Sequence, residues 1–534
     1  MKRFVLFLPA LALLSQLTAT ASSGNGFPVQ WYADKAAAAA WERGDSLLPI
    51  SGAGYVKAVS ATGESLVLVR GSKTGLKGGT SKNDICAGGM VSGDYFLFTV
   101  PVERLAAGSV VDFAVNMVGR GPGAPAYWLL EYKDGDSWKE VSDEYGLPKT
   151  HGSGFSYSLH ILSEEAYQES TLITSFRTSA PLVNSSLKLR LRAVGGLNVA
   201  GETLVRDTSS FVALCGKSFI TAELQAGYAP AMRDTAKVGF LGNSFTYYYE
   251  TPMMLMRIAH SQGHHLVMRI HHKGGRYFRE HLGLALSKEV VAEGGYDFFF
   301  LQGQSAEVAM YADSPVEFKW VMESARTLSD HIRAGSPSAK IILERTWAYS
   351  RAVSVDEKYS HPYLGFDDYA GMDAKLSEGA GLLLKVCPNI DAVSPIGDAF
   401  AAYRALYPEF YPSELKDSLK SIYAGFDDSR SNHHANRAGA YLKSCVNYLL
   451  LYGEKFCGDV DNCGIEPGLA AQLRLTAEKI VLSDARFALP EQPEFFECKR
   501  DSTLLDTRSD KVSGGSDLRG GVTHRNARAR RHNH

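Results

Sequence analysis

The hydrophobic positions follow two different rhythms along the chain, and the first is a β rhythm. Between about Gly52 and Leu224, short runs rich in β-branched and aromatic residues alternate with turns that contain Gly, Pro and Ser. Strands are expected at Ser65–Val69, Tyr95–Val100, Val110–Val118, Tyr127–Tyr132, Thr171–Phe176 and Leu187–Arg192. Asp134-Gly135 is a hairpin signal before Trp138–Val141, because both residues tolerate positive φ. This rhythm predicts an all-β sandwich or jelly-roll domain.

After about Pro230, apolar strand-like runs are separated by longer stretches of helical periodicity. Strands are expected at Val238–Leu241, Leu266–Ile270, Phe298–Leu301, Lys340–Thr346 and Asp391–Ile396, and a closing helix at Ala435–Leu451. Alternating strands and helices predict an α/β three-layer sandwich around a parallel five-stranded sheet. Ligands of such sheets bind beyond the carboxyl ends of the strands, so the chemistry is expected directly after each strand.

The length and the two chain ends define an expected domain organisation. A chain of 534 residues exceeds what one core usually organises, so two domains plus tails are expected. The N-terminus resembles a secretory signal peptide, with a basic start at Met1-Lys2-Arg3, an apolar run at Phe4–Leu17 and small residues at Ala19-Thr20-Ala21. The apolar run is too short to span a membrane. We therefore expect a signal peptide at 1–21, a β-sandwich accessory domain at 25–228, an α/β domain at 232–499 with a C-terminal helical extension at Leu469–Leu482, and a disordered basic tail at 500–534.

Charge, the N-terminal segment and the cysteines limit which partners and which cellular compartment are expected. A formal net charge of -2 gives the chain no overall attraction for nucleic acid, and the basic tail is expected to be merely solvated, with nucleic acid or anionic lipid as alternatives. The signal peptide predicts a protein secreted to the periplasm, cell surface or medium, without a membrane span. Seven cysteines leave at least one unpaired; Cys457 and Cys463 bracket a loop that they could close, and Cys86 and Cys215 share a domain. None of the seven cysteines shows the paired close spacing of a zinc site, so no structural metal is expected.

Three segments that follow predicted strands carry candidate chemistry. Ser244 comes directly after the first strand of the second half, where it is either a nucleophile or a helix cap. Gly275 and Gln304 follow the next two strands, where a backbone N–H and a side-chain amide could stabilise an oxyanion.

Histidines supply the candidate bases. His433 and His434 precede the closing helix, and either could take the proton of a serine nucleophile. His264, His265, His271 and His272 might suggest a metal, but neighbouring residues on a strand point to opposite faces. Solvated or site-lining roles are therefore expected for these four.

Taken in order, these segments resemble the SGNH/GDSL hydrolase superfamily over about Lys237–Tyr452. Gly242-Asn243-Ser244 resembles the first block, Gly-Asp-Ser, and Gly275 falls on the glycine of the second. Gln302-Gly303-Gln304-Ser305 falls on the third block, with Gln304 in place of asparagine, and His434 matches the last, five residues before Gly439. The resemblance implies a flavodoxin-like fold with Ser244 as nucleophile, His434 as base, and the N–H groups of Ser244 and Gly275 with the Gln304 side chain as oxyanion hole.

The departures from the family pattern leave alternatives open. The family's aspartate three residues before the histidine is Ser431 here, so Asp428 is assigned the orienting role, with a Ser-His dyad held by a backbone carbonyl as the alternative. The implied function is a serine esterase that removes acetyl-like groups from a carbohydrate, without a cofactor. A lipid ester is the weaker choice, because the sequence has no long apolar lid segment near the proposed site. Met253–Met256 could line an acyl pocket, but they suit a helix core better. The alternative function is a catalytically silent glycan-binding or cell-surface protein, in which Trp128, Trp138, Tyr95 and Tyr127 would stack on sugars unless they pack in the core.

Overall fold

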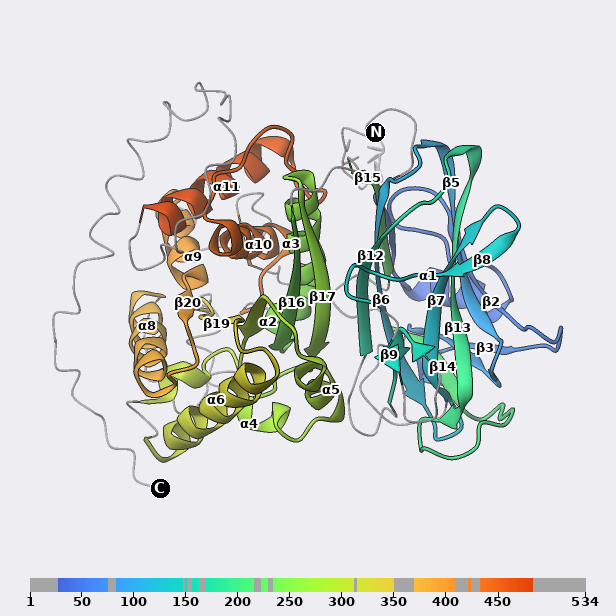
Figure 1. Cartoon of the computed structure of the whole chain (residues 1–534), viewed down its shortest axis with the longest axis horizontal. Helices are drawn as coiled ribbons and strands as arrows, with labels where there is room; N and C mark the ends of the chain where they lie inside the picture. Colours follow the sequence, from blue (N-terminus) through green and yellow to red (C-terminus); the bar gives the residue numbers. More distant parts are fainter. Residues whose placement is uncertain are drawn as a thin grey trace, which may run out of the picture.

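The computed structural model describes residues 27–74, 83–146, 149–150, 156–162, 170–215, 222–228, 234–311, 315–349, 369–408, 421–423 and 433–483. The expected signal peptide at 1–21 and the tail at 500–534 lie outside these residues. Two lobes stand side by side, one built of antiparallel sheets and the other of a parallel sheet with helices (Figure 1). None of the described helices is long and apolar enough to cross a membrane.

The N-terminal lobe contains two large antiparallel sheets. The first comprises β1 (Val29–Trp31), β3 (Val67–Arg70), β4 (Ile85–Gly88), β6 (Val110–Arg120), β12 (Ser170–Arg177), β14 (Phe211–Leu214) and β15 (Ala222–Tyr228). The second comprises β2 (Tyr55–Val59), β5 (Tyr95–Leu105), β7 (Pro125–Asp134), β8 (Ser137–Glu140), β11 (Leu159–His160) and β13 (Leu182–Asn198). Helix α1 (Lys35–Glu42), the short pair β9 (Lys149–Thr150) and β10 (Ser156–Tyr157), and a 3-10 turn at Gly71–Lys73 complete the lobe.

The strands expected in this lobe are confirmed. β7 and β8 form the predicted hairpin, and Gly135 in its turn has φ +57°. Side chains of both sheets share one buried cluster that includes Phe96, Phe98, Phe113 and Trp128. The sugar-stacking hypothesis is wrong for Trp128 and Tyr127, which are buried, while Arg190 covers the rings of Tyr95 and Trp138.

The C-terminal lobe contains the predicted parallel sheet of five strands in the order β17-β16-β18-β19-β20. These strands are β16 (Asp234–Gly242), β17 (His264–His272), β18 (Phe298–Leu301), β19 (Lys340–Glu344) and β20 (Ala392–Ser394). The central strand β16 is almost wholly buried, as expected for a parallel strand covered on both faces. In chain order the sheet is 2-1-3-4-5, the doubly wound arrangement in which ligands bind at the carboxyl edge.

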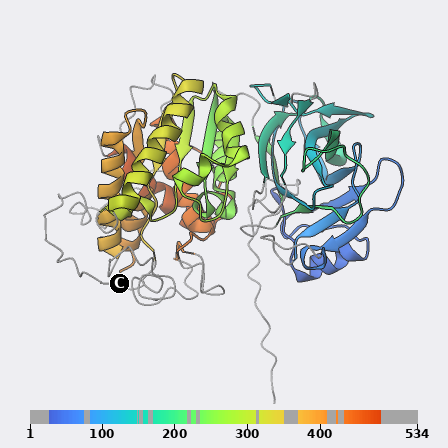
Figure 2. The same ribbon diagram turned by 90° about the horizontal axis from the view of Figure 1, so that it is seen from below.

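Helices cover both faces of this sheet (Figures 1 and 2). The helical segments are α2 (Ser244–Tyr247), η4 (Tyr248–Glu250), α3 (Thr251–Ser261), α4 (Phe278–His281), α5 (Ala285–Glu293), η5 (Glu307–Tyr311), α6 (Pro315–Gly335), α8 (Tyr369–Val386), α9 (Ile396–Ala405), α10 (Arg437–Tyr452) and α11 (Pro467–Leu482). The closing helix is confirmed as α10, and the helix expected at Leu469–Leu482 is α11, which packs against it. Met253–Met256 are buried in α3 and form helix core, as expected.

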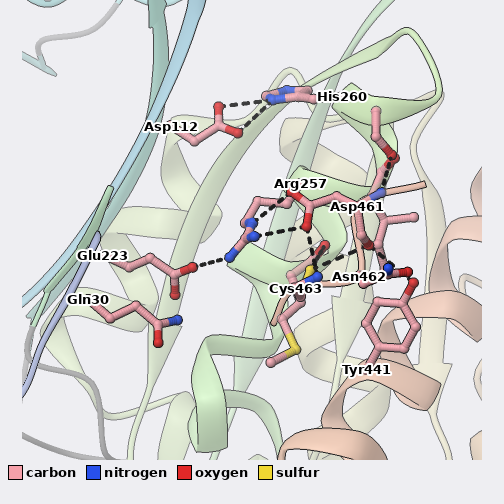
Figure 3. Close-up of polar contacts among 12 residues, drawn as sticks. Gln30, Asp112, Glu223, Arg257, His260, Tyr441, Asp461, Asn462 and Cys463 are labelled. Carbon is pink, nitrogen blue, oxygen red and sulfur yellow. Dashed lines mark hydrogen bonds and ion pairs between the residues drawn. The ribbon is translucent and has the colours of Figure 1, made fainter. Parts of the chain in front are cut away.

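The two lobes meet through buried polar side chains. Arg257 of α3 is 2% exposed; it pairs with Glu223 of β15 and lies 2.8 Å from Asp461. His260 lies 2.9 Å from Asp112 of β6 (Figure 3). Strand β6 is therefore buried on both faces, with its polar face turned toward the C-terminal lobe. Because an unpaired buried charge is costly, these contacts bind the lobes into one packed unit.

Candidate functional site

Ser244 lies at the carboxyl edge of the parallel sheet, where ligands of such sheets bind. β16 ends at Gly242, Asn243 is the N-cap of α2, and Ser244 is the first residue of that helix. The Asn243 side chain accepts a hydrogen bond from Phe245 N at 3.0 Å, so Asn243 caps the helix and Ser244 does not. The alternative interpretation of Ser244 as a cap is therefore wrong, and its hydroxyl has no capping duty.

Asn243 also joins the three loops that follow β16, β17 and β18. Its Nδ2 donates to Arg276 O at 3.2 Å and to Gly303 O at 2.9 Å. The first three sequence blocks therefore converge around the residue that precedes Ser244. In the sequence, Asn243 stands out only as the residue in place of Asp in Gly-Asp-Ser, and this role could not be predicted from it.

Gln302 also binds the segment around Asn243, where the loops after β16, β17 and β18 meet. Its buried Oε1 accepts from Asn243 N at 2.9 Å and from Thr246 Oγ1 at 3.0 Å. A Cβ atom at Gly242 would lie 2.9 Å from this oxygen, closer than side chains approach, so the position requires glycine. The nucleophile segment is therefore anchored at both its backbone and its first turn.

The two expected oxyanion donors stand in different environments. Gly275 is exposed and has φ +68°, a left-handed conformation that favours glycine. Gln304 is turned onto its own loop, where its Nε2 donates to Ser305 Oγ at 3.3 Å and its Oε1 accepts from Ala306 N at 2.8 Å. The oxyanion roles of Gly275 and Gln304 both stay predictions.

A buried carboxyl group, which the sequence did not signal, links the second and third loops. Glu307 accepts from Phe278 N at 3.1 Å and from Gln304 N at 2.6 Å. Burial raises the pKa of Glu307 to about 8, although these two N–H groups oppose the rise. Glu307 therefore fixes the loop that carries Gln304 to the start of α4.

The segment that carries the candidate bases packs against Phe245, the residue after the candidate nucleophile Ser244. The His434 ring stacks on Tyr248 with centroids 3.9 Å apart, and it lies 5.2 Å from the Phe245 ring. His433 lies 5.8 Å from the Phe245 ring and 5.2 Å from that of Tyr349, so both histidines remain near the nucleophile segment. Tyr248 is a further residue that the sequence analysis missed.

The environment keeps His434 neutral. Burial, and then the charge of His433, lower the pKa of His434 well below its ordinary value. Within the described part of the chain, neither imidazole nitrogen of His434 has a hydrogen-bond partner. Asp428, the predicted orienting residue, lies outside the described residues, as does Ser431, so the assignment of Asp428 stays a prediction.

A buried lysine joins α10 to the segment that carries Ser244. Lys443 of α10 donates to Phe245 O at 3.0 Å and pairs with Glu344 of β19 at 2.7 Å. Asn447 Nδ2 donates to the other oxygen of Glu344 at 2.7 Å, so the carboxylate is paired on both sides. Although burial lowers the pKa of Lys443, the Glu344 charge opposes that shift. This network fixes α10, which follows His434, against α2.

The four histidines of β17 are not solvated, and the expected site-lining role stays a prediction. All are buried: His264 contacts Asp234 and Glu454, His265 contacts Ser175, His271 contacts Ser287, and His272 contacts Thr171. Among the described residues, no group of three or more His, Cys, Asp or Glu side chains is placed to hold a metal ion. The expectation of solvation is wrong because β17 lies between the two lobes.

The suggested disulfide between Cys457 and Cys463 is wrong. Cys457 is in a disulfide, whereas Cys463 is a buried free thiol, so these two do not close the loop between them. Cys86 and Cys215 are also free and buried.

Comparison with known proteins gives only distant likenesses. No protein-family model and no curated protein matches the chain. Among solved structures, a DUF4886 family protein from Bacteroides uniformis is 15% identical over 47% of this chain and 95% of its own, with a TM-score of 0.37. A protein from Parabacteroides merdae described as GDSL-like lipase is 13% identical over 41% of this chain and 95% of its own, with a TM-score of 0.27.

A family two carbohydrate esterase from Clostridium thermocellum, solved with cellohexaose, is 11% identical over 69% of this chain and 94% of its own, with a TM-score of 0.28. The neighbours include ester-hydrolysing enzymes, and one carries the GDSL name of the superfamily that the sequence motifs resemble. At these identities and TM-scores, the likenesses assign no function to this chain.

Proposed function

We propose that this protein is a serine esterase of the SGNH/GDSL type with Ser244 as its nucleophile. The observation that carries the proposal is the junction at Asn243, whose side chain binds the loops after β17 and β18 and places Ser244 at the first position of α2. A serine at the N-terminus of a helix, at the carboxyl edge of a doubly wound sheet, combines a reactive hydroxyl with backbone donors for an oxyanion.

The proposed reaction is acyl transfer to water. Ser244 Oγ attacks the ester carbonyl carbon while His434 accepts the hydroxyl proton. The N–H groups of Ser244 and Gly275 and the Gln304 amide stabilise the oxyanion; its collapse expels the alcohol, which takes the proton from His434. Water then attacks the acyl-enzyme by the same route and releases the acid. Asp428, or a backbone carbonyl, orients the imidazole.

The side chains around Ser244 favour a small acyl group on a polar alcohol such as a carbohydrate. Behind the nucleophile, Phe245, Trp347 and Phe400 form a buried stack with centroids 4.5 and 4.4 Å apart, which restricts the space for an acyl chain. At the rim, Gly274 and Gly275 are exposed, and Arg276 and Tyr277 are half-buried. A polar, open rim suits a hydroxyl-rich leaving group better than a lipid.

Acetate release from acetylated xylan tests the proposal, with p-nitrophenyl acetate, butyrate and octanoate as the acyl-length series. Wild-type protein should release acetate and prefer the shortest ester, and Ser244→Ala should lose at least about 1000-fold in kcat, since removing the nucleophile of such a triad costs on the order of a millionfold. Ser137→Ala, which removes an exposed hydroxyl in the β8 hairpin, is the matched control and should keep wild-type activity. Equal rates for wild type and Ser244→Ala would refute the esterase proposal.

We also propose the organisation that goes with this activity: an exported protein with a signal peptide at 1–21, a β-sandwich accessory domain at 25–228, the hydrolase domain at 232–499 and a tail at 500–534. The two antiparallel sheets with their shared core support the second assignment, and the parallel sheet supports the third. A glycan-binding protein without activity has less support, because Trp128 and Tyr127 are buried.

A further inference from the structure

The backbone directly after the nucleophile helix adopts a costly conformation. Tyr249 has φ +58° and Glu250 has φ +49°, the left-handed region that residues other than glycine seldom occupy. Such residues persist only where the surrounding structure holds them. The turn matters for the proposed site because it follows Tyr248, on which His434 stacks.

One set of contacts to this turn comes from the N-terminal lobe. Glu250 is 0% exposed, and its Oε1 accepts from Asn116 Nδ2 of β6 at 2.6 Å. The Oδ1 of Asn116 accepts from Thr171 Oγ1 of β12 at 2.5 Å. Thr171 Oγ1 lies 3.0 Å from His272 Nε2 at the end of β17. All four side chains are buried.

The hydrogen bonds along this series of four side chains are consistent with a single donor-to-acceptor direction. Thr171 has a single hydroxyl proton, which it donates to Asn116, so it can only accept from the N–H of His272. Asn116 then donates its amide proton to Glu250. The result is a continuous path, His272 to Thr171 to Asn116 to Glu250, in which no group is asked to donate the same proton twice.

The two ends of this path reach the two sides of the proposed site. Glu250 ends the turn that follows α2, which carries Ser244. His272 is followed by Lys273, whose N–H donates to Gly242 O at 2.9 Å, and then by the loop that carries Gly275. The N-terminal lobe therefore connects the nucleophile side to the oxyanion side through two side chains of its own.

We infer that Asn116 and Thr171 of the N-terminal lobe are positioning residues for the active site, which they brace by holding the Tyr248–Glu250 turn and the start of the Gly275 loop. This inference rests on the proposed esterase function for its catalytic consequence. It assigns the N-terminal lobe a role in building the site itself, beyond that of an attached module.

The same face of the same strands offers a matched control. Four residues along each strand, Ser175 of β12 pairs in register with Asp112 of β6, as Thr171 pairs with Asn116. Ser175 Oγ lies 3.3 Å from His265 Nε2, at the opposite end of β17 from the site. Thr171→Val and Ser175→Ala therefore each remove one buried hydroxyl facing a histidine of β17, but only Thr171→Val breaks the path to Glu250.

Hydrogen exchange and steady-state kinetics together test the positioning role of Asn116 and Thr171. In Thr171→Val, the backbone amides of residues 248–251 should exchange at least tenfold faster than in wild type, and kcat for p-nitrophenyl acetate should fall at least tenfold with KM within about twofold. Ser175→Ala should change neither quantity, and Thr171→Ser, which keeps the hydroxyl, should restore most of kcat and of the protection.

Unchanged exchange at residues 248–251 in Thr171→Val would overturn the inference, as would equal losses of kcat in Thr171→Val and Ser175→Ala that follow their melting temperatures. If wild-type protein shows no Ser244-dependent hydrolysis, the proposed function fails while hydrogen exchange still decides whether the turn is held from the N-terminal lobe. The two failures are therefore distinguishable.

Discussion

Replacing Asn243 by Asp would restore the acidic residue of the Gly-Asp-Ser block that the sequence resembles, yet the structure predicts a less stable protein. An Asp side chain can still accept from Phe245 N, and Asn and Asp are about equally good N-caps. It cannot donate, so the hydrogen bonds to Arg276 O and Gly303 O are lost. A carboxylate would also face two carbonyl oxygens.

The magnitude follows from these two carbonyls. Losing the donor to a buried acceptor costs about 1–3 kcal/mol, and a hydrogen bond whose acceptor keeps another donor about 0.5–1.5 kcal/mol. Gly303 O also accepts from Gln302 Nε2, so its loss belongs to the second case, about 0.5–1.5 kcal/mol. Arg276 O lies in a partly buried loop, so its loss lies near the lower end of the first case, about 1 kcal/mol. Together with the repulsion, we expect Asn243→Asp to lower the free energy of unfolding by about 2–4 kcal/mol.

Urea unfolding followed by tryptophan fluorescence at pH 7 measures this loss. The reverse exchange at an exposed cap is the control: Asp34 caps α1 by accepting from Ala37 N at 2.7 Å, and Asp34→Asn should change the free energy of unfolding by less than about 0.5 kcal/mol. If Asn243→Asp stays within that same margin of wild type, the junction at Asn243 does not hold the three loops together.

Three further predictions concern titration and thiols. Because burial lowers the pKa of His434, the base stays neutral below pH 6.5, and kcat/KM should remain level from about pH 8 to pH 6; a fall centred at pH 6.5 would contradict this. Glu307 has a folded pKa of about 8, above its unfolded value, so stability falls with rising pH across that window by roughly 1.4 kcal/mol per unit. Glu307→Gln should gain on wild type in urea midpoint between pH 5 and pH 8, and a constant difference would refute the assignment. Alkylation in denaturant without reductant should label Cys463 and leave Cys457 unlabelled until reduction, as mass spectrometry can show.

The periodicity of the sequence predicts the strands and closing helix because each depends on local pattern. The apolar runs at 238–241 and 298–301 are the centre of the parallel sheet, where both faces are buried. Strand β6 shows the limit of this reasoning. Its alternation of Val with Asp112 and Asn116 suggests a solvated polar face, but that face is buried against α3 and the Tyr248–Glu250 turn of the other lobe. A partner more than a hundred residues away leaves no local signal.

The candidate site also contains some residues that the sequence could predict and others that it could not. Ser244 and His434 follow from motif order, because a nucleophile and its base need particular residue types. Asn243, Gln302 and Lys443 act by binding backbone carbonyls or N–H groups of other loops. Any neighbouring loop has such groups, so the sequence could not show which residues would use them. The histidines of β17 were misassigned for the same reason, since their partners include Thr171 and Ser175 from the other lobe.

Covalent labelling with a fluorophosphonate tests the central claim most directly, because the reagent reacts with an activated serine and the modified peptide identifies which one. We expect tandem mass spectrometry of wild-type protein to locate a single adduct on Ser244, and we expect Ser244→Ala to show none and His434→Ala to react at least 100-fold more slowly. An unlabelled wild-type protein, or an adduct on another serine that persists in Ser244→Ala, would contradict the assignment of Ser244 as the nucleophile.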